Sequence, residues 1–430
     1  MKPAGARLED WLDYQQRTHP NAIALGLDRV RAVWQRLGAA RPAPVVITVG
    51  GTNGKGSTVA LLEAMLRAAG RRVGSYTSPH LLHYTERIRI DGVPVDEARL
   101  IDAFERIEAA RGAGETAIAL TYFEFGTLAA LVLFAEAGLD VAVLEVGLGG
   151  RLDAVNLVDA DAAIVTTVDL DHQDWLGDDR DSIGREKAGI FRAGRPAIVA
   201  EAHPPAGLLD AAIAAGADLR RLGRDFTMEV DGDGWRWTAS GMAVSVPRPA
   251  LAAPCQPLNA AGAIAALHAL RERLGWHPAA LAEGIVRARA AGRLQRFGGA
   301  VELVVDVAHN PQAAAVLAAW LRAVPCAGRT IAVFGALADK DVAGVTAALQ
   351  GLVSRWHLAG LDLETPRGLA AAALASQPAF VQPALHAGPD AALAAAIAEA
   401  RPGDRVLAFG SFFIAAAALR LAAREALPAR

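Results

Sequence analysis

Short apolar runs alternate with amphipathic segments along most of the chain from residue 44 onward. The run PVVITVG at 44–50 predicts a buried strand, GTNGKGS at 51–57 a loop, and 58–69 a helix. Further apolar runs of strand length lie at 71–78, 140–146, 162–168 and 196–201, and helices are expected over 96–110, 122–136 and 181–191. Strands that alternate with helices predict a mostly parallel α/β sheet covered on both faces.

The pattern changes between residues 222 and 246. Alternating polar and apolar residues and several turn residues predict an antiparallel hairpin in this segment. Helices are then expected over 259–274 and 278–290, followed by a glycine- and arginine-rich linker, GRLQRFGG, at 292–299.

A second α/β alternation begins at residue 301. Strands are expected at 301–308, 330–336, 353–359 and 405–410, with helices at 311–324, 342–349 and 390–400 and a final helix at the end of the chain. We therefore predict two domains. Residues 1–290 would form a domain of the phosphate-loop type, with the loop at 51–57 after its first strand, and residues 291–430 a smaller Rossmann-like domain.

Composition and charge exclude several classes of protein. The 430 residues include 43 basic and 46 acidic residues, a net charge of −3, which argues against a nucleic-acid coat or a polybasic membrane anchor. The N-terminus lacks the apolar segment of a signal peptide, and the two cysteines form no C-x-x-C pattern. We expect a cytoplasmic protein with no membrane or nucleic-acid partner. No apolar interface stripe stands out, so we expect a monomer.

The glycine-rich loop carries the clearest chemistry. Between a predicted strand and a predicted helix, its glycines let backbone N–H groups face an anion, and the helix N-terminus adds partial positive charge. Lys55 can reach terminal phosphates, and a hydroxyl of Ser57 or Thr58 can bind Mg²⁺. The expected ATP-binding residues of this loop are Gly51, Thr52, Asn53, Gly54, Lys55, Gly56, Ser57 and Thr58. An ordinary glycine-rich turn is the alternative.

The string TNGKGS at 52–57 resembles the variant phosphate loop of the Mur ligase superfamily. It is most similar to the folate branch, the dihydrofolate synthases and folylpolyglutamate synthases. Other segments resemble the same family, in the same order along the chain: TSPHL at 77–81, ERI at 86–88, LEVGLGGRLDA at 144–154, DH at 171–172, REKAGI at 185–190, DVAHNP at 306–311 and ADKD at 338–341. Several motifs in family order are far more specific than one.

The resemblance implies an ATP-dependent carbon–nitrogen ligase that works through an acyl phosphate. Its substrates would be dihydropteroate, folates and L-glutamate, so that one enzyme makes dihydrofolate and later extends tetrahydrofolates. Three alternatives remain open: a folylpolyglutamate synthase only, a cell-wall ligase acting on a UDP-sugar peptide, and a nucleotide-binding module without activity. A UDP-binding domain has little room, because the phosphate loop begins near residue 50.

Glu145 ends a strongly apolar predicted strand, at the edge where ligands bind in such sheets. The resemblance implies that Glu145 and Ser57 hold one Mg²⁺ and that Glu145, His172 and Ser78 hold a second. Histidine is a less usual Mg²⁺ ligand than an oxygen donor. A solvated strand-end carboxylate and a structural histidine are the alternatives.

Lys187 resembles a family lysine that is carbamylated by CO₂. Carbamylation would turn a cation into an anion near the metals, and it needs the neutral amine, so we expect a depressed pKa. A plain lysine that pairs with a carboxylate or a phosphate is the alternative.

By the same resemblance, Asn259 contacts adenine and Arg293 the ATP phosphates. Asp306 lies near the ATP ribose, and Asp306 or His309 helps to deprotonate the incoming glutamate amine. The alternative for Arg293 is a solvated arginine of the linker. The alternative for Asp306 and His309 is a D-x-x-H helix cap. Lys55, Lys187, Asp306 and His309 are the expected catalytic residues.

The remaining expected contacts are to the substrates. The resemblance implies that the folate lies against Ser78, Pro79, His80, Thr121, Phe123 and Asp153. Phe123 would stack on the pterin ring and Asp153 would bind its donor edge, although an aromatic residue is often part of a core. Ser411 resembles a serine beside the glutamate pocket.

Overall fold

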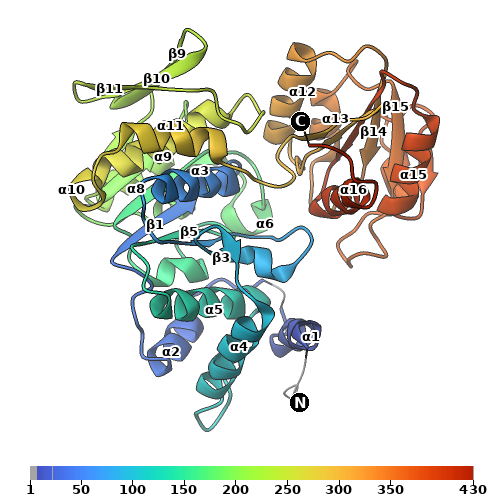
Figure 1. Ribbon diagram of the computed structural model, residues 1–430. Coiled ribbons are helices and arrows are strands. Elements are labelled where there is room, and N and C mark those ends of the chain that lie inside the picture. Colours follow the sequence, from blue (N-terminus) through green and yellow to red (C-terminus); the bar gives the residue numbers. More distant parts are fainter. Residues whose placement is uncertain (1–6, 22, 430) are drawn as a thin grey trace. The chain divides into compact units, whose positions relative to one another are not determined.

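The computed structural model describes residues 7–21 and 23–429. These residues form two compact units. The N-terminal unit runs to Ala250 and includes Pro257–Ala288, and the C-terminal unit comprises Leu251–Gln256 and the chain from Arg289 onward (Figure 1).

A mostly parallel sheet organises the N-terminal unit. Within the described residues it has eight strands in the order β4 (Val93–Pro94), β3 (Ile88–Ile90), β2 (Val73–Tyr76), β5 (Val141–Glu145), β1 (Val45–Gly50), β6 (Ala162–Val165), β7 (Pro196–Val199) and β8 (Asp218–Arg221). Only β3 and β4, at one edge, pair antiparallel. The two central strands β1 and β5 are fully buried because every residue in them can pack against a helix layer.

Helices cover both faces of this sheet. Figure 1 shows α3 (Lys55–Ala68) and α11 (Pro278–Arg287) on one side, and α5 (Tyr122–Glu136) with α4 (Glu97–Arg111) on the other. The other α-helices described for this unit are α1 (Leu8–Thr18), α2 (Asp28–Arg36), α6 (Gln173–Leu176), α7 (Arg180–Ala188), α8 (Ala206–Ala214), α9 (Gln256–Ala269) and α10 (Arg271–Leu274). The first residue of α9, Gln256, is counted with the C-terminal unit. Apolar side chains of α1, α2, α4, α5, α7 and α8 pack with one another and with side chains of the sheet in one continuous core.

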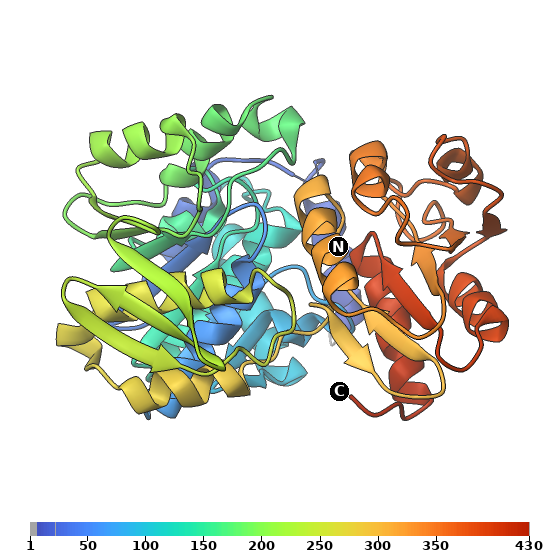
Figure 2. The same ribbon diagram turned by 90° about the horizontal axis from the view of Figure 1, so that it is seen from above.

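The segment expected to be a hairpin has one strand more. β9 (Phe226–Asp231), β10 (Gly234–Ala239) and β11 (Met242–Val246) form an antiparallel meander in which Trp237 is fully buried. Figures 1 and 2 show this small sheet beside α11.

The C-terminal unit is a second α/β sheet. Its described strands follow the order β12 (Gln295–Phe297), β13 (Glu302–Val305), β17 (Arg405–Phe409), β14 (Thr330–Phe334), β15 (Arg355–Ala359) and β16 (Ala384–His386). Its helices are α12 (Pro311–Ala323), α13 (Val342–Ala348), α14 (Ala371–Ala375), α15 (Pro389–Glu399) and α16 (Phe412–Arg424). The expected linker at 292–299 is partly a strand, because Gln295–Phe297 pairs antiparallel with β13. All other pairs in the sheet are parallel.

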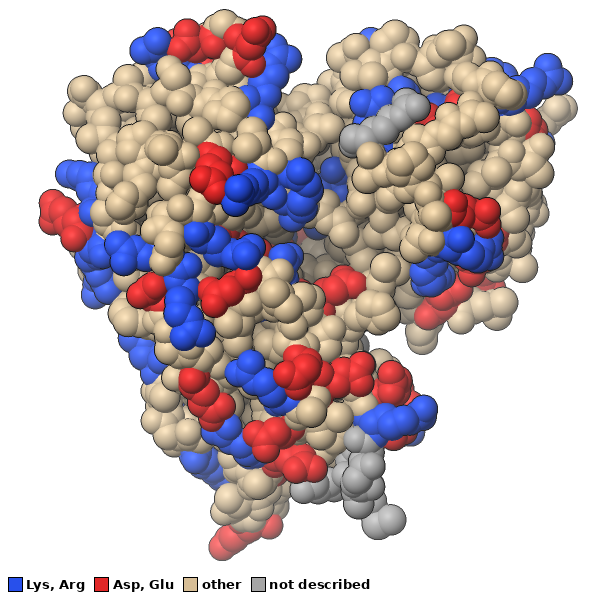
Figure 3. Space-filling model, viewed as in Figure 1, with Lys and Arg blue, Asp and Glu red and all other residues tan. Residues whose placement is uncertain are grey.

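The predicted fold class is therefore confirmed: two α/β units, with a mostly parallel sheet in the first. Basic and acidic side chains are interspersed over the face in Figure 3, in keeping with a net charge of −3. None of the helices in the described ranges has the length and apolarity that a membrane crossing requires.

Candidate active site

The glycine-rich loop joins β1 to α3, and the segment that follows β6 holds it in place. The Thr52 amide donates to the Thr167 carbonyl at 2.7 Å, and the Asn53 amide donates to Thr167 Oγ1 at 2.9 Å. Thr52 Oγ1 also donates to the Asp169 carbonyl at 3.1 Å. The loop is thus fixed by backbone and hydroxyl groups of a neighbouring strand end, and needs no ligand to set its shape.

Two glycines of the loop are required by its conformation. Gly51 has φ +143°, and a Cβ there would lie 1.9 Å from Thr166 Oγ1. Gly54 has φ +87°, and a Cβ there would lie 2.6 Å from Asn259 Oδ1. Both values lie where side chains are strained. Asn259, on α9, therefore lies directly against the loop.

The helix after the loop begins three residues earlier than the sequence indicates. α3 starts at Lys55 rather than near residue 58, with Gly54 as its N-cap. Lys55 Nζ folds back and donates to the carbonyls of Gly51 at 3.0 Å and Thr52 at 3.1 Å. Ser57 is buried in the first turn. Backbone N–H groups at such a turn can bind an anion, with the lysine beside them.

Glu145 lies at the carboxyl end of β5, where its partner in β1 is Val49. Its side chain is buried, at 3% exposed, and its Oε2 accepts from the Ser78 amide at 3.2 Å. His172 precedes α6 in the left-handed conformation, with φ 52°, and its amide donates to Asp171 Oδ1 at 2.9 Å. Two of the four expected metal ligands, Ser78 and Glu145, thus contact each other.

No cluster of three or more histidine, cysteine or acidic side chains suited to a metal is found among residues 7–21 and 23–429. The expected metal set has two members of those types, Glu145 and His172, and its other two are the hydroxyl residues Ser57 and Ser78. The expected ligands would thus supply a mixed set of one carboxylate, one imidazole and two hydroxyls.

Lys187 is the buried cation of α7, with 3% of its surface exposed. Its pKa is lowered to about 7, chiefly by burial and also by the charge of Lys55, while Asp171 acts in the opposite direction. An amine with that pKa is neutral in a large fraction of molecules at neutral pH.

Asp153 is buried beside the strand-end loop. Its Oδ2 accepts from the amides of Gly147 at 3.0 Å and Leu148 at 2.9 Å, and its Oδ1 accepts from Val155 at 3.0 Å. Burial nevertheless raises its pKa to about 7, opposed by these three amides and by the charge of Lys55. Asp153 and Lys187 therefore lie in the same electrostatic environment around Lys55.

The other expected folate residues have mixed roles. The half-buried Phe123 ring lies so close to Gly147 that a Cβ there would meet it at 2.6 Å. Thr121 is the N-cap of α5 and accepts from the Glu124 amide at 3.2 Å, so its hydroxyl has a structural task.

The loop that follows β2 carries Pro79 and His80. His80 Nδ1 accepts from Arg87 Nε at 2.9 Å. The pKa of His80 is lowered to about 4, chiefly by burial and also by the charge of Arg87. Sequence reasoning did not single out Arg87. Its position in ERI, at the start of an apolar strand, is the available signal.

The expected residues of the C-terminal unit also lie together. Asp306 accepts from the amides of Leu294 and Ala308, both at 2.7 Å, and burial raises its pKa while Arg293 opposes that shift. The Arg293 guanidinium lies 5.5 Å from the Phe412 ring, and the His309 ring lies 6.2 Å from it. Arg293 Nη1 is buried and has no hydrogen-bond partner among the described residues.

Ser411 is buried at the N-terminus of α16. Its Oγ accepts from the Ile414 amide at 3.2 Å and so caps the helix. A cap residue can still contact a ligand through its other lone pair, because a hydroxyl has two.

A parallel sheet with a phosphate loop after its central strand, followed by a second α/β unit, defines a Mur-type ligase. The Mur ligase middle domain matches residues 49–212, and the glutamate ligase domain of Mur ligases matches residues 292–412. The chain belongs to the dihydrofolate synthase/folylpolyglutamate synthase family of these ligases.

The likeness extends over the whole chain. The Escherichia coli dihydrofolate synthase/folylpolyglutamate synthase is 46% identical over 417 residues, which is 95% of this chain and 94% of that protein. A structure of E. coli FolC in complex with DHPP and ADP has a TM-score of 0.92 at 45% identity and covers 99% of this chain and 100% of that one. A bifunctional folylpolyglutamate synthase/dihydrofolate synthase with Mn, AMPPNP and L-glutamate bound has a TM-score of 0.89 at 43% identity, with the same coverage. The chain is accordingly an ATP-dependent ligase that uses a divalent metal.

Proposed function

We propose that this protein adds L-glutamate to 7,8-dihydropteroate and further glutamates to tetrahydrofolates, through an acyl phosphate. The observation that carries the proposal is the pairing of β1 with β5. It brings the lysine-bearing phosphate loop and the buried carboxylate of Glu145 to the same edge of one sheet. The names of the similar proteins, which join both activities, support the choice of substrates.

The first step activates a carboxylate. An oxygen of the folate-type carboxylate attacks the γ-phosphorus of ATP, the bond from that phosphorus to the bridging oxygen breaks, and ADP leaves. Both reactants are anions, so positive charge must offset their repulsion. Lys55 and the backbone N–H groups of the loop supply it.

The second step forms the amide. The glutamate amine attacks the acyl carbon, the carbon–oxygen bond to phosphate breaks, and phosphate leaves. The amine must lose a proton to do so, and we assign that task to His309 or Asp306. His309 Nδ1 lies 2.8 Å from the Val307 carbonyl, which fixes the ring.

We assign two divalent metal sites to the strand ends. Ser57 and Glu145 would hold one Mg²⁺, and Ser78, Glu145 and His172 the other. The donors suit the ion, because carboxylate and hydroxyl oxygens are the ligands that Mg²⁺ prefers. When bound, the metals neutralise charge on the transferring phosphoryl group.

Lys187 is the proposed site of carbamylation. The ammonium group of Lys187 first loses a proton, and the neutral amine then attacks CO₂, forming a nitrogen–carbon bond and releasing a second proton. A cation thereby becomes an anion near Lys55. ¹³C NMR of protein equilibrated with ¹³C-bicarbonate should show one carbamate signal that Lys187→Met removes. Labelled protein without such a signal would exclude the modification.

ATP would also contact residues beyond the loop. Asn259 lies against Gly54 and is assigned to the adenine, and Asp306 is assigned to the ribose. Arg293 has a buried donor without a partner among the described residues, which suits a phosphate oxygen.

The folate would lie against Ser78, Pro79, His80, Thr121, Phe123 and Asp153, and glutamate beside Ser411. The Phe123 ring packs against Gly147 and remains partly exposed, so that it can stack on the pterin. Asp153, with its pKa near 7, can accept from the donor edge of the ring.

The proposed division of labour follows the chain. We assign nucleotide and folate binding to residues 1–290 and the glutamate-ligase part to residues 291–430, in accord with the two matched domains. We also propose a monomer in the cytoplasm. A concentration-dependent mass in light scattering would contradict the monomer.

One experiment tests the substrates directly. ADP formation that depends on glutamate should be measured with dihydropteroate and tetrahydrofolate in parallel, and both should support turnover. Turnover with tetrahydrofolate but not with dihydropteroate would indicate an enzyme that has the folylpolyglutamate synthase activity only. ATP binding without ADP release on either substrate would indicate a nucleotide-binding module.

A further inference from the structure

The loop between β2 and β3 has a fixed shape that one carboxylate determines. Glu86 accepts from the amides of Leu81 at 2.9 Å, Leu82 at 2.9 Å and His83 at 2.8 Å. Three backbone donors on one side chain hold the loop in a single curl. At its start, the Ser78 amide donates to Glu145, so the loop borders the candidate active site.

Arg87, at the end of this loop, is a buried cation with an unusual set of neighbours. Only 7% of it is exposed, and its guanidinium lies 5.1 Å from the Tyr84 ring and 5.3 Å from the Tyr122 ring. Within the described ranges, no carboxylate lies at ion-pair distance from it. Two aromatic faces therefore hold the cation where a carboxylate would otherwise do so.

The direction of the hydrogen bond between Arg87 and His80 follows from chemistry alone. Arg87 Nε lies 2.9 Å from His80 Nδ1. A guanidinium can only donate, so Nδ1 must carry a lone pair. An imidazolium has no lone pair, which leaves a neutral His80 with its proton on Nε2.

The Nε2–H group is then a donor with a defined place. The His80 ring lies 5.6 Å from the Tyr84 ring, so the same tyrosine that holds Arg87 also orients the histidine. No residue in the described part of the chain accepts a hydrogen bond from Nε2. The ring is half-buried, which leaves this edge open to a ligand.

We propose that Arg87 is a positioning residue, which fixes His80 as a neutral Nε2–H donor for an oxygen acceptor of the pteroyl substrate. The inference rests on the proposed function for its substrate and on the geometry of the loop for the donor. A carboxylate or carbonyl oxygen can accept from that group, whereas an N–H group cannot. Arg87 itself does not touch the substrate, and its effect passes through the imidazole.

Steady-state kinetics can separate this role from a merely structural one. Arg87→Met keeps the apolar stem between the tyrosines and removes the donor. It should raise KM for dihydropteroate about tenfold and leave KM for ATP within about twofold. His83→Gln, in the other histidine of the same loop, is the matched control and should change neither.

A double-mutant cycle then tests whether Arg87 acts through His80. His80→Ala should raise KM for dihydropteroate by at least as much as Arg87→Met. The double variant should be no worse than His80→Ala alone. His80→Gln, whose amide nitrogen lies near the position of Nε2, should recover part of the loss. Additive effects of the two single changes would overturn the proposal.

The tautomer can be measured without any substrate. In ¹⁵N-histidine-labelled protein the His80 signal, identified by its loss in His80→Gln, should show a bare Nδ1 and a protonated Nε2. In Arg87→Met it should become a mixture. A proton on Nδ1 in the wild type, or an unchanged tautomer in the variant, would refute the positioning role.

These readouts keep the two proposals apart. If the wild type turns over dihydropteroate but Arg87→Met retains a normal KM, this inference fails and the proposed function stands. If the wild type turns over no pteroyl substrate, the proposed function fails, and the tautomer measurement still decides what Arg87 does. Arg87→Leu, which also removes the donor, replaces Arg87→Met if the latter does not fold.

Discussion

Asp153 in the N-terminal unit and Asp404 in the C-terminal unit are almost equally hidden, at 3% and 5% exposed, yet their pKa values move in opposite directions. Burial raises the pKa of Asp153 to about 7 although three backbone amides donate to it. The pKa of Asp404 is lowered by the amides of Arg329 and Arg401, and the Arg329 guanidinium contributes at 3.1 Å. The difference is a guanidinium in contact with Asp404, together with a desolvation effect on Asp404 that is smaller than the effect of its amide hydrogen bonds.

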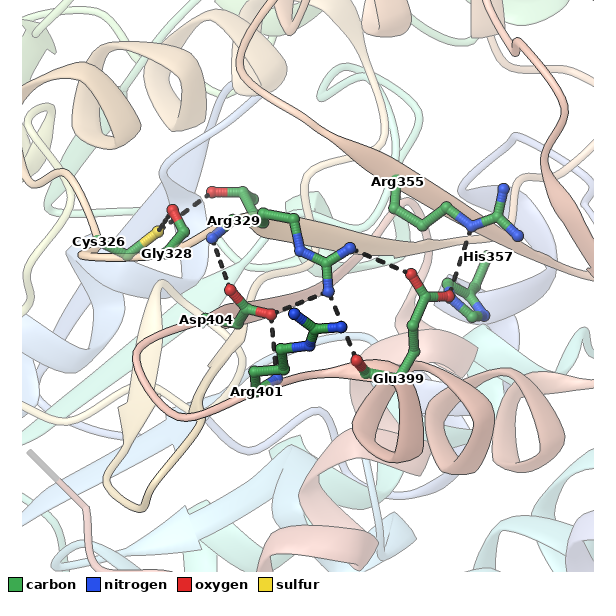
Figure 4. A network of polar contacts seen from close by, with 9 residues as sticks. Cys326, Gly328, Arg329, Arg355, His357, Glu399, Arg401 and Asp404 are labelled. Carbon is green, nitrogen blue, oxygen red and sulfur yellow. Dashed lines mark hydrogen bonds and ion pairs between the residues drawn. The ribbon is translucent and has the colours of Figure 1, made fainter.

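The same contrast separates the two regions as a whole. Asp404 precedes β17 in a network of arginines and carboxylates in which Arg329 and Arg355 also pair with Glu399, both at 3.4 Å (Figure 4). At the carboxyl end of the first sheet, Lys187 and Asp153 are buried and have shifted pKa values, and neither is in a salt bridge among the residues that the structure describes. Charges that form ion pairs within the protein stabilise the fold. Buried charged groups with shifted pKa values are instead typical of sites where a charged ligand binds.

The largest expected effect is on turnover. Lys55→Ala removes the cation that we assign to the γ-phosphate and should lower kcat by about 10³-fold or more. Arg329→Ala removes a cation of similar charge from the matched network and should leave kcat within about twofold. Near-normal kcat in Lys55→Ala would show that Lys55 is no more important for turnover than Arg329.

Substitution of Glu145 should weaken metal binding, whereas substitution of Glu399 should not. Glu145→Gln should weaken Mn²⁺ binding in the presence of an ATP analogue by about 10- to 100-fold, because the amide retains one oxygen but no charge. Glu399→Gln, in the network of Figure 4, should leave Mn²⁺ binding unchanged. Titration followed by electron paramagnetic resonance measures both, and equal affinity in the two variants would contradict the assigned ligand.

Lys187 should reduce stability in the absence of ligands. Its pKa of about 7 lies below the unfolded value of about 10.4, so the unfolded state binds the proton more tightly. The cost is fully present below pH 7 and is relieved as pH rises toward 10. Lys187→Met should therefore be more stable than the wild type at pH 7, on the order of 2 kcal/mol, in CO₂-depleted buffer without metal.

Urea unfolding measures this difference, which should shrink toward pH 10. Turnover of the same variant should be lost. If the variant is less stable than the wild type at pH 7, other groups of the protein must stabilise the charge of Lys187 in the folded state.

The smallest effect belongs to the matched region. Asp404→Ala leaves the Arg329 and Arg401 amides without their acceptor and should lower the free energy of unfolding by about 1–2 kcal/mol, with kcat retained. Because the folded pKa is depressed, the stability that the carboxylate contributes is present above the unfolded value of about 4 and is lost as pH falls through the folded pKa. The two proteins should thus converge in acid, and a constant difference down to pH 2 would count against the ion pair.

Much of the fold could be predicted from continuous apolar runs. The central strands β1 and β5 lie within the expected 44–50 and 140–146, because strands buried on both faces have no polar positions. The start of α3 was predicted three residues late, since Lys55, Gly56 and Ser57 carry no helical pattern. The sequence predicts a linker where β12 lies, because the residues of β12 carry no strand pattern of their own and form a strand only by pairing with β13.

The candidate site was predictable only in part. The loop and Glu145 stand at strand ends, which the apolar pattern locates. The nearness of Lys187 to Lys55, and of His80 to Arg87, depends on how distant or looping segments meet. Side-chain neighbours of that kind have no signal in the spacing of residues along a chain.

The central claim is that the charged groups gathered at the strand ends activate a carboxylate as an acyl phosphate. Dihydropteroate labelled with ¹⁸O in its carboxylate tests it in a single turnover with ATP and glutamate. We predict that one ¹⁸O atom appears in each inorganic phosphate released, because the attacking oxygen stays on phosphorus. Phosphate without the label, formed together with the glutamate product, would contradict the account.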